Sequence, residues 1–60
     1  MQKLREIRER QGLSQDELAE KSGVSRVTIS MLETGSQENA KTKTLFKLAA
    51  ALNVSIDSFF

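Results

Sequence analysis

The sequence of 60 residues contains no cysteine, no histidine and no proline, and its only aromatic residues are three phenylalanines. Without cysteine, no disulfide can cross-link the chain. Without cysteine and histidine, thiolate–imidazole metal sites and histidine-based catalysis are excluded. A chain this short buries only roughly 60% of its unfolded surface, so marginal stability is expected. We therefore expect one domain over residues 1–60, made of packed helices, with no metal and no cofactor.

Long hydrophobic runs are also missing. No apolar stretch approaches the ~20 residues of a membrane-spanning helix, and no signal-peptide pattern opens the chain, so we expect a cytoplasmic protein without membrane contact. The net charge is only +1. Composition therefore leaves nucleic-acid binding open, because a nearly neutral protein can still carry a locally positive face.

Apolar residues recur at helical spacing, and alternating strand patterns of useful length are absent from the sequence. This periodicity predicts an all-α protein. The expected helices are residues 1–11, 15–21, 25–33 or 34, 44–52, and a short fifth helix that begins after Ser55, with a polar loop over about 35–41.

Local signals mark where several of these helices begin and end. Ser14 is placed to cap the second helix, and Glu17 three residues later completes a capping box. Gly23 can adopt the left-handed conformation that ends that helix. Ser25 is the predicted cap of the third helix, and Thr42 that of the fourth.

The second and third helices are joined so closely that they must cross steeply. Spacing alone leaves open a DNA-binding unit and an ordinary tight helix pair. The outward face of the third helix favours DNA binding. Its side chains are small and polar or mildly apolar, whereas a solvent-facing helix usually carries Lys and Glu. A protein–protein contact is the alternative. The residues expected on this face are Val27, Ser30, Met31 and Thr34, with Thr28 at its flank.

The run from Leu13 to Gly35, LSQDELAEKSGVSRVTISMLETG, closely resembles the helix-turn-helix of the Cro and phage-repressor (XRE-type) family of transcription regulators. The tail LFKLAAALNVSIDSFF resembles the last two helices of that family. The resemblance implies a compact five-helix, lambda-repressor-like DNA-binding domain, with the helix-turn-helix unit over about 15–33. One departure lies after Gly35, where the proline and dense basic residues common in the family are missing and Glu38 is present.

This resemblance implies a non-enzymatic regulator of transcription that binds double-stranded DNA, and we expect a repressor. Residues 25–33 would form the recognition helix in the major groove. The alternative is a protein-binding module of the same fold, such as an antitoxin component. The sequence holds no nucleophile–base pair and no phosphate-cradling loop that would favour an enzyme, and we expect no small-molecule ligand.

Candidate DNA contacts divide into base and phosphate contacts. Arg26 occupies the first turn of the recognition helix, where its guanidinium could contact guanine or grip a phosphate. The residues expected to read bases are Arg26, Val27, Ser30 and Met31. The residues expected to contact phosphates are Gln15, Ser25, Thr28, Lys41 and Lys43, although Ser25 could be a simple cap and the lysines simply solvated. For Gln15, the family resemblance points to the same role.

Two further contacts are expected. Arg8 and Glu33 both lie at the edge of a buried helix face, so we expect a structural ion pair, and the family resemblance points to the same pairing. One recognition helix covers only a few base pairs, so we expect a homodimer on DNA. Phe60, with Ile56 or Phe59 nearby, is the candidate two-fold contact, and burial of all three in the core is the alternative.

Overall fold

The computed structural model describes residues 2–35 and 41–60, and these residues form an all-α domain, which confirms the predicted fold class. The elements are α1 (Gln2–Arg10), α2 (Gln15–Ser22), α3 (Arg26–Thr34), α4 (Thr42–Leu52) and a single 3-10 turn, η1 (Ile56–Phe59). The departure from the family pattern at Glu38 lies outside the described residues. None of the helices in the two described ranges is long and apolar enough to cross a membrane.

The predicted caps of α2 and α3 are present. Ser14 Oγ accepts the Glu17 N–H at 3.0 Å, and a Glu17 carboxylate oxygen accepts the Ser14 N–H at 3.0 Å, so the capping box is complete. Gly23 ends α2 with φ 72°, in the left-handed region that favours glycine. Ser25 then caps α3 by accepting the Thr28 N–H at 3.2 Å. These local bonds fix the short connection between the two helices.

The prediction for the start of α4 was wrong. Thr42 is the first helical residue, and Lys41 occupies the N-cap position in an extended conformation without a side-chain capping bond. The backbone explains the difference, because the Leu45 N–H already donates to the Lys41 carbonyl at 3.1 Å. The first turn of α4 therefore forms around Thr42 and leaves no capping role for its hydroxyl.

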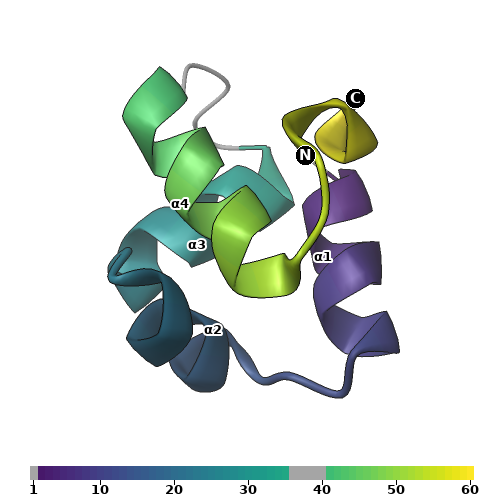
Figure 1. The fold of residues 1–60 in the computed structure, drawn as a ribbon. Coiled ribbons are helices and arrows are strands. Elements are labelled where there is room, and N and C mark those ends of the chain that lie inside the picture. Colours follow the sequence, from purple (N-terminus) through teal and green to yellow (C-terminus); the bar gives the residue numbers. More distant parts are fainter. Residues whose placement is uncertain (1, 36–40) are drawn as a thin grey trace.

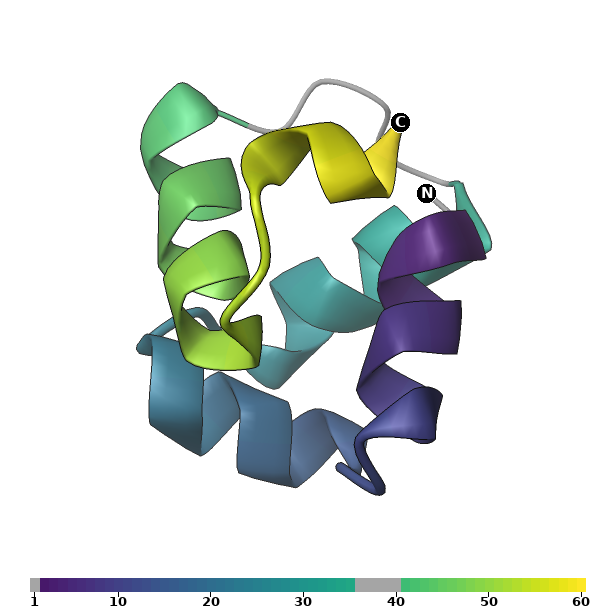
Figure 2. The ribbon, with the colours of Figure 1, turned by 45° about the vertical axis from the view of Figure 1, so that its right-hand side comes forward.

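Helix α3 lies at the centre of the arrangement, between α1 and α4, while α2 crosses beneath them (Figures 1 and 2). Helix α2 packs on α3 and α4, and α1 packs on α3 and η1. The C-terminal turn returns to the start of α1 (Figure 2), where Lys3 Nζ donates to the Phe60 carbonyl at 2.7 Å. The helix-turn-helix unit is thus held by α4, which packs on α2, and by α1, which packs on α3.

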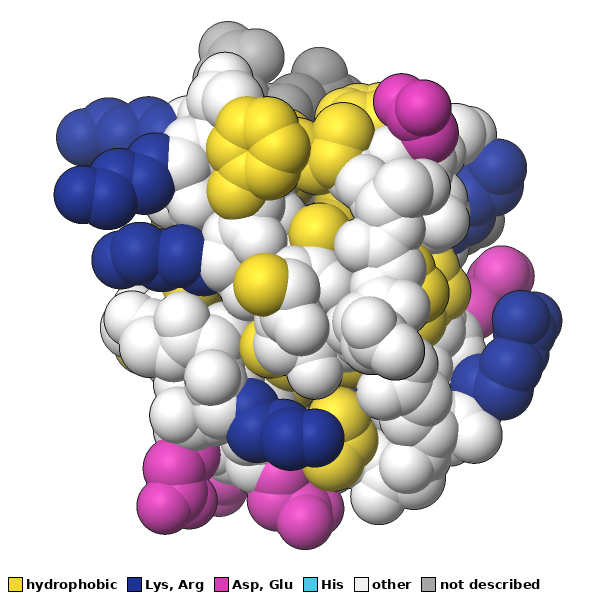
Figure 3. All heavy atoms as spheres, in the orientation of Figure 1, with side chains coloured by type: hydrophobic (Ala, Val, Ile, Leu, Met, Phe, Trp, Pro, Cys, Tyr) yellow, Lys and Arg dark blue, Asp and Glu magenta, His cyan; other side chains and the backbone are white. Residues whose placement is uncertain are grey.

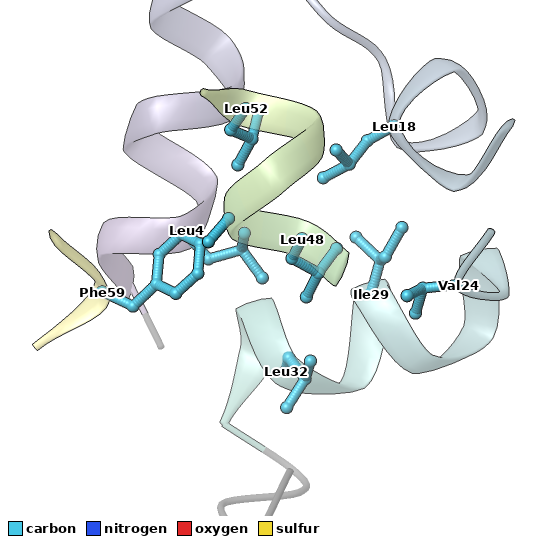
Figure 4. Packing of buried hydrophobic residues seen from close by; sticks show 9 residues of the cluster. Leu4, Leu18, Val24, Ile29, Leu32, Leu48, Leu52 and Phe59 are labelled. Carbon is cyan, nitrogen blue, oxygen red and sulfur yellow. The ribbon is translucent and has the colours of Figure 1, made fainter. Parts of the chain in front are cut away.

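All four helices and η1 contribute to one hydrophobic core. Figure 4 shows the phenyl ring of Phe59 against Leu4, and Leu48 between Leu4 and Ile29. Phe59 is only 3% exposed. Its ring is packed in the core, so Phe59 fits the alternative of a core residue and offers little surface for a dimer contact. The buried hydrophobic residues are Leu4, Leu18, Val24, Ile29, Leu32, Leu48, Ala49, Leu52 and Phe59.

Candidate nucleic-acid interface

The outward face of α3 carries apolar side chains in solvent. Val27 is 67% exposed and Met31 is 37% exposed, while Arg26 is exposed and Ser30 is half-buried. The opposite face of α3 is buried against the core. A shallow hollow in the surface is lined by Gln15, Arg26, Val27 and Ser30. The structure therefore brings Gln15, at the start of α2, together with three of the four expected base-reading residues.

Gln15 is tied to the buried side of α3. Its Nε2 donates to Glu33 Oε1 at 3.0 Å, and the side chain is half-buried. An amide group has two N–H donors and one acceptor oxygen. One N–H is therefore occupied by Glu33, which leaves the second N–H and the oxygen for a partner outside the protein.

Arg8 and Glu33 form the expected pair. Arg8 Nε donates to Glu33 Oε2 at 2.6 Å, and Arg8 Nη2 donates to Glu33 Oε1 at 3.0 Å. A third Arg8 nitrogen, Nη1, donates to the Leu13 carbonyl at 2.7 Å. Both residues are buried. Across residues 2–35 and 41–60, every buried side-chain nitrogen and oxygen has a hydrogen-bond partner.

The ionised form of this pair is favoured. Burial alone would raise the pKa of Glu33, but the hydrogen bonds from Arg8 and Gln15 outweigh it, and the pKa lies below its ordinary value. The hydrogen bond to Glu33 likewise raises the pKa of Arg8. The result is a charge-assisted, bidentate link between α1 and α3, to which Gln15 of α2, one of the residues that line the hollow, adds one hydrogen bond.

Ser25 and Thr28 are hydrogen-bonded to each other, and only Thr28 keeps a hydroxyl proton for another partner. Besides accepting the Thr28 N–H, the Ser25 hydroxyl donates to Thr28 Oγ1 at 2.9 Å. Its proton is therefore used within the cap. Thr28 Oγ1 accepts this bond and keeps its own proton. Thr28 is therefore better placed than Ser25 to donate a hydrogen bond to a phosphate.

Lys41 and Lys43 lie exposed at the start of α4, and Lys47 is exposed one turn later. Figure 3 shows Lys and Arg side chains projecting from the edge of the molecule where α4 begins, whereas acidic side chains gather below α2. Three lysines therefore give this part of the surface a local positive charge that the net charge of the chain does not show.

An ion pair between the two helices of the unit was missed from the sequence. Arg26 Nε lies 3.3 Å from Asp16 Oδ1, and both side chains are exposed. Sequence spacing gives no signal for this contact, because it depends on the angle at which α2 and α3 cross. Arg26 is therefore not a free cation on the candidate surface but one with an acidic neighbour.

The exposed aromatic residues lie outside α3. Phe60 is 71% exposed and Ile56 is half-buried. Phe46 on α4 is also exposed, and sequence reasoning missed it. The available signal was its position beside Leu45, off the apolar stripe of that helix. Figure 3 shows hydrophobic side chains gathered between α4 and the C-terminal turn.

Comparison with known proteins adds to this geometry. A helix-turn-helix family model matches residues 4–59. An uncharacterized HTH-type transcriptional regulator of Archaeoglobus fulgidus is 40% identical over 58 residues, which cover 97% of this chain and 81% of the relative. The HTH-type transcriptional regulator SinR of Bacillus subtilis is 38% identical over 55 residues, covering 92% of this chain but only 50% of SinR.

A solved structure is similar as well. The restriction-modification controller protein C.AhdI from Aeromonas hydrophila superimposes with a TM-score of 0.92 at 39% sequence identity, covering 98% of this chain and 88% of that chain. The likeness extends over nearly all of the chain, so it includes the α2–α3 unit and the helices that hold it in place.

Proposed function

Because this chain belongs to the helix-turn-helix family of DNA-binding transcriptional regulators, we propose that it reads a specific sequence in double-stranded DNA with the outward face of α3. The main observation that supports this proposal is the exposure of Val27 and Met31 on the same face as Arg26. Exposed apolar groups on the same helix face as a guanidinium suit the major groove, which offers thymine methyl groups and guanine acceptors.

The proposed contacts fall into two groups. Arg26 binds guanine, Val27 and Met31 pack on thymine methyl groups, and Ser30 hydrogen-bonds a base edge or a backbone oxygen. Phosphates are bound by residues near the starts of α2, α3 and α4, which fixes the register of the protein on the duplex. The residues proposed to contact phosphates are Gln15, Thr28, Lys41 and Lys43, while the Ser25 hydroxyl, which donates to Thr28, positions Thr28.

A binding experiment tests this proposal. The protein selects duplexes from a randomised library, and fluorescence anisotropy then measures its affinity for the selected duplex as salt is raised. We expect affinity to fall steeply with salt, because phosphate contacts release counterions. The triple variant Arg26→Ala, Val27→Ala and Met31→Ala should lose the preference for the selected duplex, while Arg10→Ala on α1 should keep it. Unchanged binding by the triple variant would remove α3 from the interface.

We further propose that the protein binds as a homodimer, with Phe60 and Ile56 at the two-fold contact, and that it represses transcription. It would act in the cytoplasm, where it meets the chromosome. A reporter whose promoter carries the selected duplex tests repression, because expression should fall when the protein is present. No change or a rise in expression would contradict repression without affecting the DNA-binding proposal.

A further inference from the structure

One ion pair links the N-terminal ends of the two helices that form the candidate interface. Arg26 Nε, in the first turn of α3, lies 3.3 Å from Asp16 Oδ1, in the first turn of α2. Arg26 also lines the surface hollow together with Gln15, the residue before Asp16. The pair therefore lies at the border of the surface that would receive DNA.

The chemistry of the guanidinium allows a second partner. Arginine presents five N–H donors in a rigid planar fork. A carboxylate beside Nε leaves the terminal nitrogens, Nη1 and Nη2, for another acceptor. Two parallel donors match O6 and N7 of guanine in the major groove. Asp16 can thus hold the inner part of the guanidinium while its outer edge contacts a base.

The same carboxylate acts differently toward phosphate. Asp16 is exposed beside Gln15, which is proposed to contact the DNA backbone, so its negative charge opposes the approach of any duplex. On a site that offers guanine to Arg26, the approaching DNA displaces water, which strengthens the attraction between Asp16 and Arg26. On other sites, Arg26 must either leave Asp16 for a phosphate or remain unpaired on its outer edge.

We infer that Asp16 is a specificity-determining residue, which acts by positioning Arg26 for guanine and by penalising duplexes that offer no guanine there. This inference rests on the proposed DNA-binding function. Discrimination of this kind combines an attractive contact to the right site with a repulsive element against wrong ones. In the free protein the pair is exposed, and such pairs change an equilibrium by at most about fivefold. The main effect of Asp16 should therefore appear in DNA binding and not in folding.

The test compares two duplexes. One is the duplex that the wild-type protein selects from a randomised library, and the other has the same composition in scrambled order. Asp16→Asn removes the charge with little change of shape. We expect this variant to bind the scrambled duplex more tightly than wild type, and the ratio of the two affinities to fall by about three- to tenfold. Asp16→Ala should change the affinity ratio in the same direction.

A matched control is available on α1. Arg5 Nε lies 3.5 Å from Glu9 Oε1, and this pair is exposed to a similar degree. Glu9→Gln removes the same charge away from the interface, so it should leave the affinity ratio unchanged. In an Arg26→Ala background, Asp16→Asn should also leave the ratio unchanged, because Asp16 then has no guanidinium to position.

Three outcomes would overturn the inference: an unchanged ratio for Asp16→Asn, an equal gain of affinity on both duplexes, or an effect on the ratio that persists in the Arg26→Ala background. The second would make Asp16 a simple source of repulsion, and the third would mean that Asp16 changes specificity without acting through Arg26. If the wild-type protein itself bound both duplexes alike at every salt concentration, sequence-specific binding would fail first, and the role of Asp16 with it.

Discussion

At the scale of single residues, Glu33 connects folding with recognition. Its carboxylate accepts hydrogen bonds from Arg8 on one side and from Gln15 on the other. A buried charge left without its partner costs about 3–5 kcal/mol. We therefore expect Arg8→Ala and Glu33→Ala each to lower the free energy of unfolding by about this amount, as measured by urea denaturation.

The exposed pair of Arg5 and Glu9 provides the comparison for that experiment. Arg5→Ala removes an arginine from the same helix but from solvent, where ion pairs contribute about 0–1 kcal/mol. If Arg8→Ala were no more destabilising than Arg5→Ala, the pair of Arg8 and Glu33 would behave as a surface contact, and its structural role would be wrong.

The same carboxylate predicts how stability depends on pH. Its pKa in the folded protein is lowered, so the unfolded chain takes up the proton first as the pH falls. The stabilising contribution is therefore complete above the ordinary glutamate value of 4.5 and is lost as the pH falls below it. Glu17 acts in the same direction, because its hydrogen bond from the Ser14 backbone lowers its pKa.

Denaturation series at neutral pH and at successively lower pH values measure this dependence. We expect the wild-type free energy of unfolding to decline with acid, and Glu33→Gln to show a flatter decline from a lower starting value. Glu17→Gln serves as a second comparison at an exposed site. A wild-type profile that stays level into the acid range would contradict the lowered pKa of Glu33.

Arg26 is the residue for which two kinds of DNA contact make different predictions. If it reads a base, Arg26→Ala should cost about 1–3 kcal/mol on the preferred duplex and relax the preference at one base pair. If it grips a phosphate, binding should weaken alike on all sequences, and the salt slope should fall by about one. Affinities on a single-substitution library at two salt concentrations distinguish them, and uniform weakening would reject base reading.

At the scale of helices, the sequence predicted those ends that local chemistry decides. Ser14, Glu17 and Gly23 act within one turn of their own positions, so their pattern alone was sufficient for α2. The start of α4 was not predictable in this way. Lys41 offers no capping side chain, and the helix begins there because of a backbone hydrogen bond and the packing of its apolar side.

Contacts between helices were only partly predictable from the sequence. Arg8 and Glu33 could be expected because burial leaves a charge few alternatives. Asp16 and Arg26 are both exposed, so neither burial nor periodicity points to their contact. Gln15 was expected at the DNA backbone, but its bond to Glu33 depends on how α2 lies against α3. The helices were thus predictable, and their mutual orientation was needed for the site.

The uncapped start of α4 gives a prediction in which stability and DNA binding change in opposite directions. Lys41→Ser supplies the missing capping oxygen, so we expect about 0.5–1 kcal/mol of added stability. It also removes a proposed phosphate contact, so affinity should fall alike on all sequences. Lys43→Ser lies inside the helix, where it should weaken DNA binding similarly without adding stability. Thermal melting and anisotropy on both variants check this, and a loss of stability in Lys41→Ser would contradict it.

At the scale of the whole molecule, size limits what one copy can do. The extents of the described domain are 24 × 22 × 19 Å. Half-sites of related helix-turn-helix proteins are about 34 Å apart, one turn of the duplex. A single copy is therefore too small to place a recognition helix in two successive major grooves on one side of the DNA. Reading a full site of this kind requires two copies.

The proposed two-fold contact makes this requirement testable. Phe60 is 71% exposed, whereas the adjacent Phe59 is 3% exposed, so the two phenylalanines have separable roles. We expect Phe60→Ser to keep its melting temperature at low protein concentration but to weaken binding of the second copy to the selected duplex. Phe59→Ala should instead cost about 3–5 kcal/mol of stability at every protein concentration, because it leaves a cavity in the core. Analytical ultracentrifugation with and without the duplex counts the copies bound.

Two copies on the wild-type complex, with the second weakened by Phe60→Ser, would support the contact. One copy per duplex at saturation would reject the dimer, and two copies bound equally well by Phe60→Ser would move the contact elsewhere on the surface.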